Sequence, residues 1–464
     1  MLRRMARPNP AYICTSCERT VPQWVGRCPN CGEWNALEAH GAGAVGTASE
    51  VVALRSVTGG ATPPMSTGIG EVDRVLGGGF VAGSVTLVYG PPGVGKSTLL
   101  FQVLSSVASA GVDVLLASAE ESLAQVSGRA GRIGAVPERL LALEGHDVVA
   151  IETAIRQHRP GLVVVDSIQS ISDVEVPGAA GSLLQVKACV ERLTRLAKAC
   201  DVPIVLVGHV TKDGDLAGPR AIEHLVDTVL SFDGDRHHAV RLLTAIKHRF
   251  GPAGEVGIFE MREDGLRAVP DPGKLLLGDR LAGMSGSVVV PVLQGRRPLL
   301  VEVQALVASS PASGGRPRAL GVDPSRVSLL IAVLEARAEH PISGKDVFIA
   351  AVGGITITEP AVDLAIALAL ASAANDRPVN FDLVAFGELG LAGELRMVPG
   401  ADRRLAEAQR AGFTRAIVPA STPSEAIPDG MEVHQVRTLF DAVRVFFSDF
   451  TGTMPTWSIG AASR

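Results

Sequence analysis

The segment from Gly90 to Ser97 has the residue types of a loop that binds nucleotide phosphates. It reads GPPGVGKS, which matches the pattern G-x-x-x-x-G-K-[ST]. In this pattern the glycines let backbone N–H groups surround phosphate oxygens, Lys96 reaches the β- and γ-phosphates, and Ser97 ligates Mg²⁺. The sequence therefore predicts a site for ATP with Mg²⁺. The residues expected to form it are Gly90, Pro91, Pro92, Gly93, Val94, Gly95, Lys96, Ser97 and Thr98.

Carboxylates follow two other apolar segments. LVVVD (162–166) ends in Asp166, which is expected to face the Mg²⁺ ion. VDVLLAS is followed by Glu120 and Glu121 after one alanine. Because a carboxylate at the C-terminal end of a parallel strand can point into the ligand crevice, Glu120 is the first candidate for the base that polarises the attacking water, and Glu121 the second. The other glutamate would begin the next helix, where a negative side chain is favourable. Position alone does not assign the two roles.

A cysteine cluster near the N-terminus has metal-ligand spacing. Two C-x-x-C pairs are separated by ten residues, which lets four sulfurs converge tetrahedrally on one Zn²⁺ ion. A segment this short can scarcely bury a core, so metal binding and folding are expected to be one event. Trp24 and Trp34 are expected to pack on the cysteine turns, although an exposed tryptophan can also stack on a base. The expected zinc ligands are Cys14, Cys17, Cys28 and Cys31.

The elements that position these residues can be read from the apolar pattern. SVTLVYG, DVLLAS, GLVVVDS, VPIVLVGHV and DTVLSF are apolar runs typical of strands buried on both faces. They alternate with helix-like segments such as 97–109 and 182–200. This alternation predicts a doubly wound α/β domain with a parallel sheet, in which the phosphate-binding loop joins a strand to a helix.

The overall composition limits the class of protein. The chain has 464 residues, of which 47% are hydrophobic, and a net charge of -5. No run reaches the roughly 18 apolar residues that cross a bilayer, and no signal peptide is recognisable. We therefore expect a cytoplasmic protein without a membrane partner. Because the net charge is negative, binding to nucleic acid must depend on local basic clusters.

The chain is expected to divide into domains with linkers between them. A second α/β pattern follows the first, and glycine-rich or charged segments separate the parts. The expected parts are a zinc module at 11–34, a flexible linker at 35–62, an ATPase domain at 63–270, a linker at 271–282, a second α/β domain at 283–450 and a tail at 451–464.

Taken in order, these motifs resemble the RadA (Sms) family of bacterial DNA-repair proteins. They are the four-cysteine module, STGIGEVDRVLGGG, GPPGVGKST, LVVVDSIQS, GHVTKDGDLAGPRAIEHLVDTVL and KHRFG. The resemblance implies a RecA-like ATPase that is stimulated by single-stranded DNA and forms a hexameric ring. It also implies branch migration on branched DNA during recombination, together with a RecA-type recombinase. In RecA-like ATPases the region of His209 carries a polar sensor of the γ-phosphate, and we expect His209 to have that role.

The family signature KNRFG appears in this chain with histidine in place of asparagine. By resemblance, Lys247 and Arg249 would engage DNA or sense the nucleotide of a neighbouring subunit. The basic run Lys247, His248 and Arg249 can also track a phosphate backbone by charge. Phe250 is interpreted as a core anchor, with base stacking as the alternative. Gly251 completes the motif.

The C-terminal α/β region is similar to the proteolytic domain of Lon, most clearly in FGELGLAGELRMVPGADRRLAEAQRAGF. This similarity raises the alternative of an ATP-dependent serine protease with a Ser–Lys dyad. At the dyad positions, however, the chain has Asp363 and Asp402. Aspartate supplies neither the nucleophilic hydroxyl nor the activating amine, so a proteolytically inactive domain is expected. Its paired arginines, such as Arg403 and Arg404, are candidates for a duplex or subunit interface, with a solvated surface as the default. A further alternative is a non-motor scaffold in which ATP only gates DNA binding.

Overall fold

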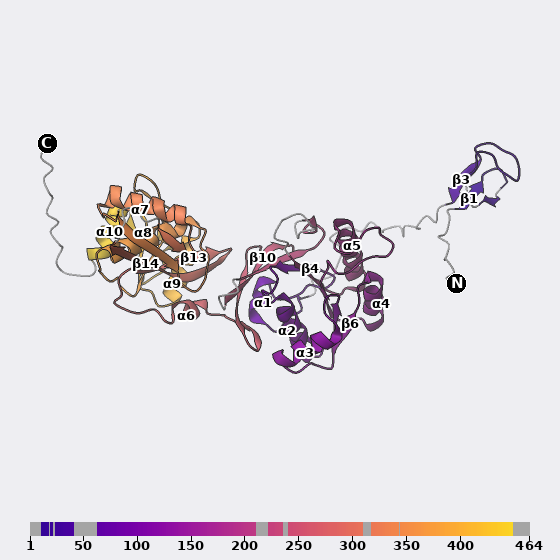
Figure 1. Cartoon of the computed structure of the whole chain (residues 1–464), viewed down its shortest axis with the longest axis horizontal. Coiled ribbons are helices and arrows are strands. Elements are labelled where there is room, and N and C mark those ends of the chain that lie inside the picture. The colour runs from indigo at the N-terminus through magenta and orange to yellow at the C-terminus, as the bar shows by residue number, and fades with distance from the viewer. Residues whose placement is uncertain are drawn as a thin grey trace. The chain divides into compact units, whose positions relative to one another are not determined.

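The computed structural model describes residues 11–17, 19–21, 24–40, 63–209, 221–234, 240–309, 317–342 and 344–448. The chain divides into an N-terminal unit that ends at Thr62 and a larger unit that begins at Pro63 (Figure 1). Most of the expected linker, from residue 41 to residue 62, and the expected tail lie outside the described residues. Within the described residues, no helix is long and apolar enough to cross a membrane.

The N-terminal unit is a small antiparallel sheet whose strands lie in the order β2-β1-β3. The strands are β1 (Ala11–Cys14), β2 (Thr20–Val21) and β3 (Leu37–His40). β3 lies in the segment that we expected to be linker, and it pairs with β1 along its whole length. The zinc module therefore extends beyond residue 34 to His40, because the third strand completes its sheet.

The ATPase domain contains a nine-stranded sheet. In spatial order its strands are β12 (Gly265–Ala268), β11 (Val256–Arg262), β10 (Val240–His248), β9 (Thr228–Asp233), β4 (Val85–Gly90), β8 (Ile204–His209), β7 (Leu162–Asp166), β5 (Val114–Ser118) and β6 (Leu140–Glu144). The six strands from β9 to β6 are parallel, and β10 to β12 add an antiparallel extension. This confirms the RecA-like α/β fold class, with the phosphate-loop strand β4 between β8 and β9.

Helices cover both faces of this sheet, as expected for a doubly wound fold (Figure 1). They are α1 (Gly70–Val75), α2 (Lys96–Ser109), α3 (Leu123–Ile133), α4 (Val148–His158) and α5 (Leu183–Cys200). One apolar core contains buried residues of α1, α2 and α3, and another contains those of α4 and α5. The central strands β4, β5, β7, β8 and β9 are buried on both sides, which explains their nearly continuous apolar sequences.

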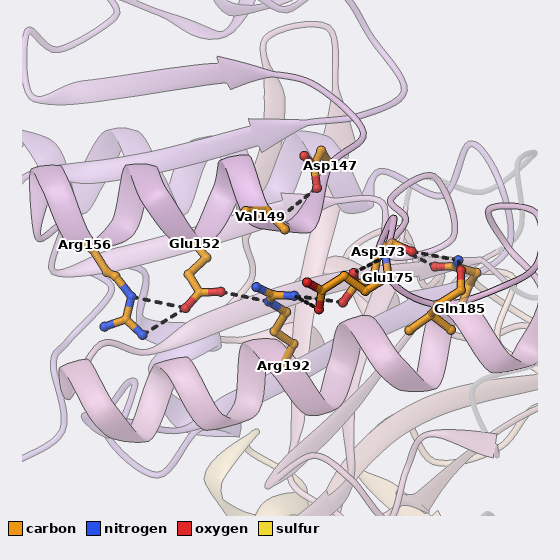
Figure 2. Close-up of polar contacts among 9 residues, drawn as sticks. Asp147, Val149, Glu152, Arg156, Asp173, Glu175, Gln185 and Arg192 are labelled. Atoms are coloured by element: carbon orange, nitrogen blue, oxygen red, sulfur yellow. Dashed lines mark hydrogen bonds and ion pairs between the residues drawn. The ribbon is translucent and has the colours of Figure 1, made fainter. Parts of the chain in front are cut away.

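A polar network fastens the segment after β7 to α4 and α5 (Figure 2). Arg192 on α5 donates to Glu152 on α4 at 2.8 Å and to Asp173 at 3.0 Å. Gln185 accepts from the backbone N–H of Asp173 at 2.8 Å and donates to the carbonyl of Val176 at 2.6 Å. The chain that leaves the end of β7 is thus held at several points directly beyond the candidate site.

The C-terminal domain is built on a seven-stranded sheet. In spatial order its strands are β15 (Arg318–Leu320), β16 (Lys345–Ala351), β14 (Arg297–Ser309), β13 (Ser287–Gln294), β17 (Leu383–Ala385), β20 (Arg415–Pro419) and β21 (Glu432–Val436). A separate small sheet pairs β18 (Glu388–Leu389) with β19 (Leu395–Arg396). The helices are α6 (Pro272–Leu277), α7 (Pro324–Ala338), η3 (Pro360–Val362), α8 (Asp363–Ala374), α9 (Ala401–Arg410), η4 (Ser424–Ala426) and α10 (Leu439–Ser448).

The expected linker at 271–282 is a packed segment. It contains α6, whose Leu276 belongs to the apolar core of the C-terminal domain. Arg280 is buried beside Glu302 of β14, with 3.9 Å between its Nε atom and the carboxylate. Proline at the first turn and an apolar LLL run make this a helix rather than an extended connection.

Candidate nucleotide site and zinc centre

The phosphate-binding loop connects β4 to α2 in a conformation that requires glycine. Gly93 and Gly95 have φ angles of 78° and 112°, in the left-handed region that other residues rarely adopt. A Cβ atom on Gly90 would lie 2.0 Å from the carbonyl oxygen of Phe232. Lys96 is buried, and its ammonium donates to the carbonyls of Gly90 at 2.8 Å and Pro91 at 3.1 Å. The Lys96 side chain therefore folds back over the loop in which it is expected to bind phosphate.

The C-terminal ends of neighbouring strands bring the other candidates together. Gly90 pairs with His209 between β4 and β8, and Ser118 pairs with Asp166 between β5 and β7. As a result, ligand atoms of Glu120, Asp166 and His209 lie within 4.8 Å of one another. Residues from three separate strands thus meet at one edge of the sheet, which is where α/β domains bind ligands.

Asp166 and Ser97 fit a magnesium ion. Burial raises the pKa of Asp166, and a hydrogen bond from Ser97 opposes that shift. One carboxylate oxygen of Asp166 is buried and has no hydrogen-bond partner within the described residues. A buried carboxylate oxygen without a donor is costly unless a cation compensates it. A carboxylate and a hydroxyl side by side are oxygen ligands of the kind that Mg²⁺ takes in ATP sites.

The structure distinguishes the two adjacent glutamates. Glu120 faces the site: its Oε1 atom accepts from Ser167 at 2.5 Å and lies 3.2 Å from Nε2 of His209. Glu121 instead forms an ion pair with Arg129 of α3 at 2.7 Å. The contact with His209, followed by that with Ser167, lowers the pKa of Glu120 to about 2. This carboxylate is therefore ionised at neutral pH and suited to orienting a water molecule.

Sequence reasoning missed the two serines that contact Glu120. Ser167 and Ser170 both donate to its Oε1 atom, from the turn that follows β7. They belong to the DSIQS segment, which had served only as part of the family resemblance. A polar, small-residue run directly after a buried strand was the available indication.

The KHRFG motif begins with the last two residues of β10, Lys247 and His248, and contacts its own domain. Lys247 donates to the carbonyls of Glu223 at 2.7 Å and Val226 at 2.8 Å, and burial lowers its pKa. Arg249 pairs with Asp227 at 2.8 Å, and the other oxygen of Asp227 accepts from the backbone N–H of Val85 at 3.0 Å. These contacts hold the motif against the start of β4, the strand that leads to the phosphate-binding loop. Lys247 and Arg249 are therefore paired with carbonyl and carboxylate groups of their own domain and do not form a free basic run.

His248 and Phe250 complete this arrangement. Nδ1 of His248 lies 3.0 Å from the hydroxyl of Thr228, and Nε2 lies 3.1 Å from the carbonyl of Leu76. Because a carbonyl only accepts, Nε2 carries the proton of this contact. Gly251 must be glycine, since a Cβ there would lie 2.8 Å from the His248 ring. Phe250 is 50% exposed, so the interpretation as a core anchor is wrong.

The four cysteines of the N-terminal unit fit a zinc ion. Their sulfur atoms all lie within 4.8 Å of one another, with 3.5 Å between Cys14 and Cys31 and 3.7 Å between Cys17 and Cys28. Four sulfurs at the usual Zn–S distance are separated by about 3.8 Å in a tetrahedron. Backbone N–H groups of Cys31 and Asn30 lower the pKa of Cys28 to about 6, which favours the thiolate that binds metal.

The tryptophans of this unit do not pack beneath the cysteine turns. Trp24 and Trp34 are both exposed, and the guanidinium of Arg27 lies over the Trp34 ring, 5.7 Å from its centroid. The expectation that they pack on the cysteine turns is therefore wrong. The five buried residues of the unit's core include two of the expected zinc ligands, Cys14 and Cys28, and neither tryptophan.

In the described part of the C-terminal domain, a buried and paired aspartate occupies the position expected for the dyad serine. Asp363 at the nucleophile position is fully buried and forms a two-point ion pair with Arg326. Its carboxylate also accepts from the backbone N–H of Leu389 at 3.0 Å. Arg404, which we had considered for a duplex or subunit interface, is fully buried and pairs with Glu359. These charges hold the domain together.

Three family models match the chain. One is described as an AAA domain and covers residues 66–215. One is described as a rubredoxin metal binding domain and covers residues 12–39. One is described as subunit ChlI of Mg-chelatase and covers residues 351–422.

Curated relatives match almost the whole chain. The DNA repair protein RadA of Bacillus subtilis is 43% identical over 95% of this chain and 99% of its own length. The DNA repair protein RadA of Mycolicibacterium smegmatis is 44% identical over 93% of this chain and 96% of its own length. That of Pseudomonas aeruginosa is 42% identical over 96% of this chain and 100% of its own length. A solved structure of the RadB recombinase covers 44% of this chain and 99% of its own, with 25% identity and a TM-score of 0.36.

The fold and the site define a P-loop ATPase that has an N-terminal zinc ribbon with a structural zinc ion and a Lon-like C-terminal domain. ATP with Mg²⁺ is the ligand of its central domain. Because relatives above 40% identity align over more than nine-tenths of it, the chain belongs to the DNA repair protein RadA family.

Proposed function

We propose that this chain is a DNA-stimulated ATPase that drives branch migration of recombination intermediates. It would act on single-stranded and branched DNA in the cytoplasm, as a hexameric ring, together with a RecA-type recombinase. Membership of the RadA family supports the role in DNA repair. The observation that carries the proposal of ATP turnover is the meeting of Glu120, Asp166 and His209 beside the phosphate-binding loop.

Within this site we assign each residue one role. Backbone N–H groups of the loop and the Lys96 ammonium bind the triphosphate, and Ser97 and Asp166 hold the Mg²⁺ ion that neutralises its charge. Glu120 orients the attacking water, while Glu121, which pairs with Arg129, stays outside the reaction. His209, 3.2 Å from Glu120, is assigned as the γ-phosphate sensor.

The KHRFG motif is assigned to coupling between DNA and nucleotide. The Arg249 side chain is half-exposed, and its guanidinium forms an ion pair with the carboxylate of Asp227. Asp227 in turn accepts from Val85 at the start of β4, the strand that ends in the phosphate-binding loop. A DNA strand or neighbouring subunit that competes for Arg249 would therefore act on a strand that leads to the nucleotide.

Measuring ATP hydrolysis with and without single-stranded DNA tests this function. We expect DNA to raise the rate and Lys96→Ala to abolish hydrolysis, whereas Lys274→Ala, an exposed lysine on α6, should leave it unchanged. Arg249→Ala should retain nucleotide binding but lose branch migration. A hydrolysis rate indifferent to DNA would contradict the motor and favour the ATP-gated scaffold. Normal branch migration by Arg249→Ala would contradict the role assigned to the motif.

The protease alternative is tested in the same preparation by casein cleavage. We expect none, because the carboxylate of Asp363 is buried and paired with Arg326. ATP-dependent cleavage of casein by purified protein would overturn this conclusion.

A further inference from the structure

Two serines from one turn converge on a single oxygen of Glu120. Ser167 Oγ donates to Oε1 at 2.5 Å, and Ser170 Oγ donates to the same atom at 3.2 Å. Nε2 of His209 approaches Oε1 at 3.2 Å as well. Since these three contacts all end on Oε1, Oε2 is the oxygen that they leave for another partner.

The turn that supplies these hydroxyls is itself fixed. Ser167 is fully buried and directly follows Asp166, the expected Mg²⁺ ligand. The N–H of Ser170 donates to the carbonyl of Ser167 at 3.1 Å, and the N–H of Ile168 donates to the carbonyl of Val207 in β8 at 2.9 Å. The turn is therefore held between β7 and β8, and its hydroxyls have a defined place relative to the metal ligand.

A glutamate side chain has three rotatable bonds and samples many orientations unless its carboxylate is held. Hydrolysis of a phosphoanhydride depends on a water molecule in line with the bond that breaks, so the orientation of the polarising carboxylate matters. A misplacement of about 1 Å can cost roughly 100-fold in rate. Contacts that fix one oxygen of Glu120 leave the other pointing in one direction.

We propose that Ser167 and Ser170 are positioning residues that hold Glu120 through Oε1, so that Oε2 orients the water attacking the γ-phosphate. This inference depends on the role assigned to Glu120 in the proposed function. Neither serine touches the nucleotide in this mechanism; both act through the glutamate.

Steady-state ATP hydrolysis by the full chain tests the inference. Ser167→Ala should lower kcat by about 10-fold to 100-fold while KM for ATP changes by less than about twofold, because only the orientation of the attacking group is lost. Ser170→Ala should give a smaller loss in kcat, and Ser170→Thr, which retains the hydroxyl, should restore the rate. Ser172→Ala is the matched control, because Ser172 lies on the same segment and its hydroxyl reaches the carbonyl of His146 at 3.4 Å instead.

A double-mutant cycle separates positioning from general damage. In a Glu120→Gln background, single-turnover hydrolysis of radiolabelled ATP should show no further loss when Ser167→Ala is added, because the group that Ser167 orients is already disabled. Equal losses in the two backgrounds, or a wild-type kcat in Ser167→Ala, would overturn the inference. If Glu120→Gln itself hydrolyses ATP at the wild-type rate, the assignment of Glu120 in the proposed function fails instead.

Discussion

Replacing Arg192 by methionine should destabilise the ATPase domain by removing the cation between α4, α5 and the segment after β7 (Figure 2). Arg192 contacts Glu152 at 2.8 Å and Asp173 at 3.0 Å. The Asp173 side chain is only 7% exposed, whereas that of Arg192 is 25% exposed. Removing one partner of a fully buried pair costs about 3–5 kcal/mol, and removing an exposed partner about 0–1 kcal/mol. Because Arg192 lies between these limits, we expect a loss of about 2 kcal/mol.

Differential scanning calorimetry of the full chain measures this loss. For a domain of about 200 residues, 1 kcal/mol corresponds to a shift of about 2–4 °C, so Tm of the ATPase transition should fall by about 4–8 °C. Arg139→Met is the matched control, because Arg139 pairs with Asp113 at 2.8 Å and both side chains are half-exposed. It should shift Tm by less than about 2 °C.

The pH dependence of the difference in Tm between wild type and Arg192→Met tests whether the ion pairs cause the loss of stability. Hydrogen bonds from Arg192 and then Arg156 hold the pKa of Glu152 below its ordinary value. The N–H of Glu175, and after it Arg192, do the same for Asp173. Carboxyls with a lowered pKa stabilise the folded state above their unfolded pKa values, near 4, and lose that contribution as pH falls. The gap between wild type and Arg192→Met should therefore narrow as pH falls from about 5 to about 3. A constant gap, or a shift no larger than that of Arg139→Met, would refute the reasoning.

Three other perturbations test separate parts of the molecule. Cys28→Ser, or a strong chelator, should remove zinc from the ribbon, as measured by a colorimetric metal assay, while the calorimetric transition of the ATPase domain stays in place because the ribbon is a separate unit. Gly95→Ala should abolish binding of a fluorescent ATP analogue, since φ is 112° and a Cβ would lie 2.6 Å from the Met261 methyl group; Gly128→Ala, with open space around it, should bind normally. Asp363→Ser should lower the stability of the C-terminal domain by about 2–4 kcal/mol in calorimetry without creating casein cleavage, because it leaves a charge unpaired and supplies no lysine.

The features that the sequence predicted correctly are local ones. The phosphate-binding loop is defined by residues within eight positions of one another, and the zinc ligands by two short pairs. Long apolar runs likewise predicted the parallel sheet, because strands buried on both faces have a distinctive composition. Neither a local motif nor composition tells two adjacent residues at a strand end apart, so the sequence alone did not assign the roles of Glu120 and Glu121. In the structure, Glu121 differs from Glu120 because it pairs with Arg129.

Features that depend on distant partners were mispredicted or missed. Arg404 was interpreted as a surface or interface charge because its partner Glu359 lies 45 positions away in the sequence. β3 was assigned to a linker because only its pairing with β1 makes it a strand. Ser167 and Ser170 were missed because their contact with Glu120 spans two different strand ends. In each case the role of the residue or strand depends on a partner distant in the sequence, which the local sequence pattern does not reveal.

The placement of β8 and β9 gives the proposed coupling a physical route. Both strands pair with β4 in parallel, one on each side. β8 ends at His209, beside Glu120, and β9 begins at Thr228, whose hydroxyl contacts His248 of the KHRFG motif. β8 therefore ends at the side of the sheet where the phosphate-binding loop lies, and β9 begins at the opposite ends of the strands, beside the motif. Lys247 holds the segment that enters β9 by donating to the carbonyls of Glu223 and Val226, so the motif and the start of β9 are joined by direct contacts.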